Sequence, residues 1–137
     1  MKNLKNKLSK KGGFTLVEML IVVAIIAILI AVSIPLIGNS LENARKATDD
    51  ANERAAKAEG SIIFLAGGTV DGAGGSPFAA GKANGSFWYN NKDGKLQTAQ
   101  PAAYGQSQTE GHVGQAVIVT IDATNGTVST SWGNVSG

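Results

Sequence analysis

The hydrophobic pattern of the chain begins with one unbroken apolar run. From Phe14 to Ile37, twenty-four residues, Glu18 is the only charged side chain. A helix of that length reaches about 36 Å at 1.5 Å per residue, which exceeds the roughly 30 Å hydrocarbon core of a bilayer. The run, residues 14–37, therefore predicts a helix that can span a membrane.

An amphipathic pattern follows over residues 38–66 and predicts that the helix continues. Apolar or small residues recur there at alternating spacings of three and four. They are Leu41, Ala44, Thr48, Ala51, Ala55, Ala58, Ile62 and Leu65. Because a coiled coil would favour larger residues, we expect this stripe to pack on the protein's own sheet. Gly60 weakens the helix, so the helix could end at Gly60 instead of at Leu65.

Residues 67–137 predict a glycine-rich loop and a small β-sheet head. Seven glycines between Gly67 and Gly85 indicate a long surface loop, which is the first place to look for a partner-binding surface. Two hairpins then follow from strand signals around turn-rich stretches. Their strands are Ser86–Tyr89 with Lys95–Thr98, and Ala116–Ile121 with Thr127–Trp132. The expected fold class is α+β, a long N-terminal helix packed on a small antiparallel sheet.

Alternation along the strands assigns side chains to faces. Val117, Val119 and Ile121 share one face, which we expect to cover the helix stripe. Phe87 and Tyr89 share a face and Trp88 takes the other. This split favours core packing over a carbohydrate- or surface-binding aromatic patch.

Charge is concentrated before the apolar run. Five of the twelve basic residues lie in the first eleven positions, which places this basic leader in the cytoplasm and the rest of the chain outside. A general secretory signal carries its small-residue cleavage site after the apolar stretch. Here Gly12 and Gly13 lie before it, so a cut after residue 13 would remove the leader, residues 1–13, and keep the anchor.

Glu18 is unusual because a carboxylate in a membrane helix costs roughly 2.5–3.5 kcal/mol at mid-membrane. One interpretation is an interfacial side chain tolerated by snorkelling or protonation. The other is that Glu18 pairs with a cation from a neighbouring helix, such as a new amino terminus at Phe14.

The junction from Lys10 to Leu20, KKGGFTLVEML, resembles the class III leader of type IV prepilins. That family combines a basic leader, Gly, a cleavage point, Phe and then Glu at the fifth mature position. The resemblance covers Lys10 to about Ile37. It implies cleavage between Gly13 and Phe14 by a membrane-bound prepilin peptidase, N-methylation of Phe14, and contact of Glu18 with the Phe14 amine of an adjacent subunit. It also implies a helix hinge at Pro35, where the alternative is that the proline simply marks the end of the membrane span.

Composition gives little support to a nucleic-acid partner and excludes cysteine chemistry. Removing the leader changes the formal charge from +2 to −3, with seven basic residues against ten acidic ones, so the basic pI is weak evidence for a nucleic-acid partner. The chain has no cysteine and therefore no disulfide or thiolate chemistry.

Few residues suggest catalysis or ligand binding. His112 is the only histidine and has no nucleophile motif nearby, and no zinc-ligand spacing occurs. We predict no enzyme activity, cofactor or metal site. Asp93 and Asp122 are compatible with calcium, but turn chemistry explains them without a metal. Three Asn-x-Ser/Thr triplets, at Asn84, Asn125 and Asn134, are treated as incidental.

The sequence thus predicts a filament subunit. It would be a homo-oligomer, with prepilin peptidase, the assembly machinery and the cytoplasmic membrane as partners, and would end in an extracellular pilus used in adhesion or motility. A secretion pseudopilin and a DNA-uptake pilin are alternatives within the class. From another class, the chain could be an uncleaved single-pass anchor displaying an adhesive domain.

Overall fold

The computed structural model describes residues 12–73 and 77–136. Lys10, Lys11 and the rest of the predicted basic leader before Gly12 lie outside the described residues. Two units divide the chain, residues 1–38 and 39–137. The elements are α1 (Leu16–Ala66), β1 (Gly85–Asn90), β2 (Lys95–Gln97), β3 (Gln115–Asp122) and β4 (Thr127–Asn134). This is the expected α+β architecture of a long helix and an antiparallel sheet.

Helix α1 runs past both of its potential breakers. Pro35 lies inside it, and the helix also continues through Gly60, so an end at Gly60 is wrong. The helix stops at Ala66 because Gly67 adopts a positive φ of 78° and donates its N–H to the carbonyl of Ile63 at 3.1 Å. This left-handed glycine cap is a common helix C-terminus.

The sheet has the strand order β2-β1-β3-β4, with every neighbouring pair antiparallel. Each predicted hairpin is present, with strand ends that differ by one or two residues from the expectation. The two hairpins join through β1 and β3, where Phe87 lies opposite Val119. The turn of the second hairpin is held by Asp122, whose carboxylate accepts the backbone N–H groups of Thr124 and Asn125.

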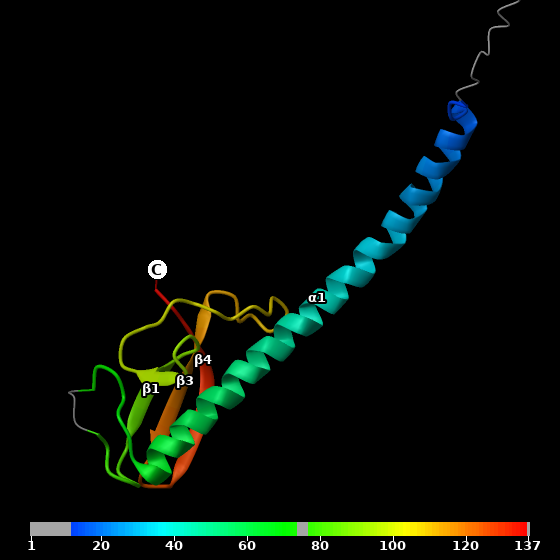
Figure 1. Ribbon diagram of the computed structural model, residues 1–137. Helices are drawn as coiled ribbons and strands as arrows, with labels where there is room; N and C mark the ends of the chain where they lie inside the picture. The colour runs from blue at the N-terminus through cyan, green and yellow to red at the C-terminus, as the bar shows by residue number, and fades with distance from the viewer. Residues whose placement is uncertain (1–11, 74–76, 137) are drawn as a thin grey trace, which may run out of the picture. The chain divides into compact units, whose positions relative to one another are not determined.

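The core of the 39–137 unit lies between this sheet and the second half of α1 (Figure 1). Val117, Val119 and Ile121 are at most 1% exposed, which confirms that they share the buried face of β3. Phe87 and Tyr89 are also buried, as alternation predicts. From the helix, Ala56 and Ile63 enter the same cluster.

The predicted packing stripe of α1 is wrong. All eight of its residues, from Leu41 to Leu65, are exposed, and Leu65 is 72% exposed. The side that packs inward instead carries Glu42, Asp49, Ala56 and Ile63 at intervals of seven residues. The hydrophobic pattern missed this side because its first two positions are carboxylates, which can be buried only where other groups donate hydrogen bonds to them.

The glycine-rich connection between α1 and β1 is a loop, but part of it belongs to the core. Val70 and Ala83 are buried, and Phe78 packs edge to face on Phe87 with ring centroids 5.9 Å apart. The backbone of Gly68 exchanges hydrogen bonds with that of Phe78 at 3.0 and 2.7 Å. These contacts hold the described parts of the loop against the sheet.

Candidate functional site

The segment around the predicted cleavage point is exposed and precedes the helix. Residues 12–15 have no regular secondary structure, and Phe14 is 83% exposed. A protease needs backbone that is free of helical hydrogen bonds and open to solvent. The bond between Gly13 and Phe14 meets both conditions.

Thr15 and Glu18 form the helix start together. The Glu18 N–H donates to Thr15 Oγ1 at 3.2 Å, and the Thr15 N–H donates to Glu18 Oε2 at 2.8 Å. This reciprocal pair is a capping box, which satisfies two backbone donors that a helix N-terminus otherwise leaves unpaired. Glu18 therefore has a local structural role in the single chain, which the sequence interpretation did not include.

The first half of α1 presents an apolar surface. In the described part of the chain, α1 is the one helix long and apolar enough to cross a membrane, and none of its apolar window is buried. Pro35 removes a backbone donor in this half, and two residues earlier Ser33 Oγ donates to the carbonyl of Leu29 at 2.7 Å. Pro35 lies far along the helix from Thr15 and Glu18 and does not join them.

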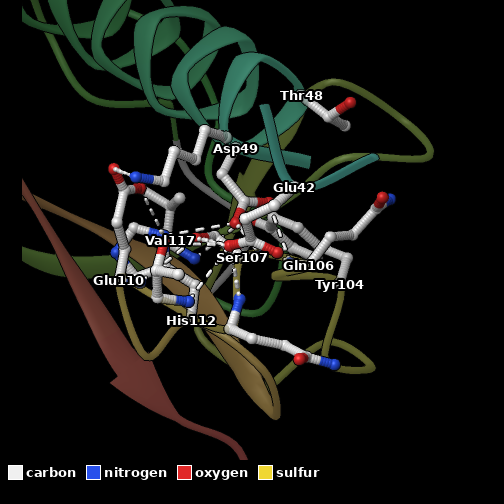
Figure 2. Close-up of polar contacts among 12 residues, drawn as sticks. Glu42, Thr48, Asp49, Tyr104, Gln106, Ser107, Glu110, His112 and Val117 are labelled. Carbon is white, nitrogen blue, oxygen red and sulfur yellow. Dashed lines mark hydrogen bonds and ion pairs between the residues drawn. The ribbon is translucent and has the colours of Figure 1, made fainter. Parts of the chain in front are cut away.

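A second polar site lies in the 39–137 unit, where two carboxylates of α1 hold the loop of residues 104–112 (Figure 2). We call this arrangement the carboxylate clasp. Asp49 is fully buried and accepts the backbone N–H of Gln106 at 3.0 Å and that of Ser107 at 2.8 Å. The ring nitrogen Nδ1 of His112 lies 3.2 Å from Asp49 Oδ2.

Glu42, two helical turns before Asp49, binds the next part of the loop. Its Oε1 accepts the Ser107 hydroxyl at 2.8 Å and the backbone N–H groups of Gln108 and Thr109 at 3.0 Å. These hydrogen bonds, from the Thr109 backbone first and the Ser107 hydroxyl next, lower the pKa of Glu42 from 4.5 to about 2. Glu42 is therefore ionised at neutral pH, and its charge is held by the loop.

Aromatic rings complete the clasp. His112 stacks on Trp132 of β4 with ring centroids 4.2 Å apart, and Tyr104 meets the same indole edge to face at 5.9 Å. The Tyr104 hydroxyl donates to the carbonyl of Tyr89 and accepts the N–H of Val117, each at 3.0 Å. Burial raises the pKa of Tyr104 to about 12. The loop is thus tied to α1, β1, β3 and β4.

The contacts of the carboxylate clasp stabilise the fold. Hydrogen-bonded carboxylates and stacked rings join distant parts of a chain that has no disulfide. Among the described residues, no group of three or more His, Cys, Asp or Glu side chains is arranged to hold a metal. Sequence reasoning missed the clasp and treated His112 only as a possible triad member. The available signal was the seven-residue interval from Glu42 to Asp49, Ala56 and Ile63.

Comparison with known families bears on the N-terminal site. The family model described as the prokaryotic N-terminal methylation motif matches residues 8–34. The chain therefore carries the signal motif of class III prepilins and type IV pilins, which indicates a pilin-like or pseudopilin precursor. The motif and the apolar helix fit a membrane-anchored, structural protein. Neither the curated proteins nor the solved structures contain a significant match to the chain.

Proposed function

We propose that the chain is the structural subunit of a type IV pilus-like filament. A prepilin peptidase cuts it between Gly13 and Phe14, Phe14 is N-methylated, and the assembly machinery builds the helix into a homo-oligomeric fibre outside the cell. The observation that carries this proposal is the methylation motif at residues 8–34, in which the exposed residues 12–15 directly precede the apolar first half of α1.

Glu18 supports assembly through its charge. Its hydrogen bond from the Thr15 N–H stabilises the carboxylate but leaves the negative charge in place. In an apolar environment that charge needs a cation nearby. The proposed partner is the amine created at Phe14 of an adjacent subunit. Each ion pair in the filament would then join the Phe14 amine of one subunit to the Glu18 carboxylate of another.

The exposed surface of α1 supports the filament in a second way. The stripe from Leu41 to Leu65 is exposed along its whole length, whereas Asp49 and Ala56 of the same helix are buried. It holds Leu41, Ile62 and Leu65, each at least 48% exposed, among small residues that permit close approach of another helix. A second copy would bury this side, which the single chain leaves open to solvent.

Glu18→Gln tests the assembly role apart from the cap. Glutamine completes a capping box as glutamate does, but it has no charge. We expect the parent filament fraction, sheared from cells, to contain a chain that begins at methylated Phe14 by mass spectrometry. We expect Glu18→Gln and Glu18→Ala both to be processed and both to be missing from that fraction.

Three results would contradict parts of this assignment. If Glu18→Gln assembles like the parent while Glu18→Ala does not, Glu18 acts as a cap and the charge pairing is wrong. If the chain remains full length in the membrane, it is an uncleaved anchor with an adhesive domain. A cleaved and methylated chain that never reaches the sheared fraction would instead indicate a secretion pseudopilin.

Topology and the hinge belong to the same proposal. We infer a cytoplasmic leader and an external head, residues 67–137, with the membrane segment at 14–37 and its amphipathic continuation at 38–66. Pro35 is the proposed hinge at which the helix loosens during assembly, because a proline removes one hydrogen bond from the preceding turn.

A further inference from the structure

The outer face of the sheet, the one turned away from α1, carries an aromatic surface. Trp88 is half-buried and points to this face, since its neighbours Phe87 and Tyr89 are buried on the other. Across the strands, Trp88 lies between Gln97 of β2 and Ile118 of β3, and Ile118 lies opposite Ser131 of β4. We call this cross-strand row the sheet platform.

Gly133 of β4 leaves room for the indole of Trp88 because it has no side chain. A Cβ atom at Gly133 would lie 3.0 Å from Cη2 of Trp88 and would also collide with Cδ1 of Ile118. The indole therefore reaches over the bare backbone of β4 instead of standing against a side chain. An aromatic ring that lies along a sheet presents one of its faces to whatever approaches from solvent.

The groups around the ring are neutral and able to form hydrogen bonds. The next cross-strand row holds Ser86, Thr120 and Ser129, and the hydroxyls of Ser86 and Thr120 are 2.9 Å apart. The strand residues on this face are charged only at its ends, at Lys95 and at Asp122, whose carboxylate is used by its own turn. The face offers no charge complementarity to an acidic or a basic partner.

We propose that the sheet platform binds a neutral polysaccharide. A pyranose ring has a flat face of C–H groups, which the electron-rich face of an indole attracts, and equatorial hydroxyls at its rim. The hydroxyls and amides around Trp88 can donate to and accept from those sugar hydroxyls. A β-linked glucan or chitin repeats such rings along one chain, so several copies of the protein can bind it with avidity. This site is separate from filament assembly.

Retention on microcrystalline cellulose and on chitin beads tests the proposal, with the full chain solubilised in detergent so that no filament is needed. We expect the parent chain to be retained on at least one of the two. Trp88→Ala should lose about tenfold in apparent affinity, the effect of removing one aromatic contact. Ser131→Glu, which places a charge on the platform without touching the core, should weaken retention similarly.

Two controls complete the experiment. Asn43→Glu adds the same charge on α1, on the other side of the sheet, and should be retained like the parent. Glu18→Gln should also be retained like the parent, because its expected defect is in assembly. The proposal is wrong if the parent chain binds neither polysaccharide, or if Trp88→Ala and Ser131→Glu bind as the parent does. It is equally wrong if those variants only reduce recovery of filaments, since the face would then be a contact between copies.

Discussion

Single carboxylates determine how the head is held together. Asp49 and Glu42 lie on the same side of α1, and between them they accept the backbone N–H groups of residues 106–109. A carboxylate bound by several N–H groups is more strongly held than a neutral acceptor. Asp49 also faces His112, the only histidine, so one buried side chain joins the helix to two points of the loop.

Asp49→Ala measures the value of this buried acceptor. The substitution leaves the N–H groups of Gln106 and Ser107 without their partner, at a cost of about 1–3 kcal/mol for a buried unsatisfied group. We expect the free energy of unfolding to fall by about 3 kcal/mol. Urea unfolding in detergent, followed by tryptophan fluorescence, measures the change. Asp50→Ala, at the exposed neighbouring position, is the control, and an equal loss there would refute a specific role of Asp49.

Glu42 predicts how the head responds to acid. Its pKa is lowered from 4.5 to about 2, so its stabilisation is complete above pH 4.5 and is lost as the pH falls toward 2. We expect the parent chain's urea midpoint to decline across this range and Glu42→Gln to flatten the decline. Asp122, whose pKa is lowered by hydrogen bonds from Asn125, contributes separately, so Asp122→Asn is measured alongside. Parallel profiles for Glu42→Gln and the parent would contradict the assignment.

At the scale of elements, Gly60 permits α1 to approach the sheet. A Cβ atom at this position would lie 2.5 Å from Cγ1 of Val119 and 2.9 Å from Cγ1 of Val128. Glycine weakens the helix by about 1 kcal/mol relative to alanine. That local cost is offset because the missing side chain allows the helix to pack directly on β3 and β4.

Gly60→Ala tests this close approach against a second helical glycine. Overpacking typically costs about 1–3 kcal/mol, which exceeds the gain in helix propensity, so we expect a net loss of stability. Gly38→Ala is the matched control because a Cβ atom there meets nothing within 4 Å. It should be neutral or slightly stabilising. Thermal unfolding by circular dichroism compares the two variants. Equal changes in their unfolding midpoints would show that helix propensity alone determines the effect of either substitution.

At the scale of the whole molecule, α1 has two sides with different uses. Ala56 and Ile63 pack inward on the sheet, whereas Ala51 and Ala55 are exposed to solvent. An isolated chain gains nothing from an exposed row of alanine, leucine and isoleucine. The row is useful where a second copy covers it, in agreement with the proposed filament.

Ala51→Glu tests the outward side of α1. Because Ala51 is exposed, we expect the unfolding midpoint of the solubilised chain to remain unchanged. A charge placed between closely packed helices would require burial without a partner, so recovery in the sheared fraction should fall at least tenfold. Asn43→Glu, also exposed on α1 but beside the stripe, should assemble. Normal assembly of Ala51→Glu would exclude this side from the interface.

Local sequence determined the elements and the N-terminal motif of this protein. The apolar run, the strand alternation and the turn residues are properties of neighbouring positions, so the helix, both hairpins and the buried faces of β1 and β3 could be predicted. The methylation motif is equally local, since Gly13, Phe14 and Glu18 lie within a few residues of one another. The capping box also has a local signature, Thr15 followed three positions later by Glu18, although our sequence analysis did not use it.

Only the tertiary structure decided which side of α1 faces the sheet and what the clasp contains. Hydrophobicity assigns carboxylates to solvent, so it placed the Leu41 to Leu65 stripe inward and missed the side that carries Asp49. The reverse holds because backbone N–H groups of residues 106–109, from 57 to 67 positions later in the chain, converge on Asp49 and Glu42. Burial of a charge depends on donors brought from a distance, and no local pattern records where those donors will lie.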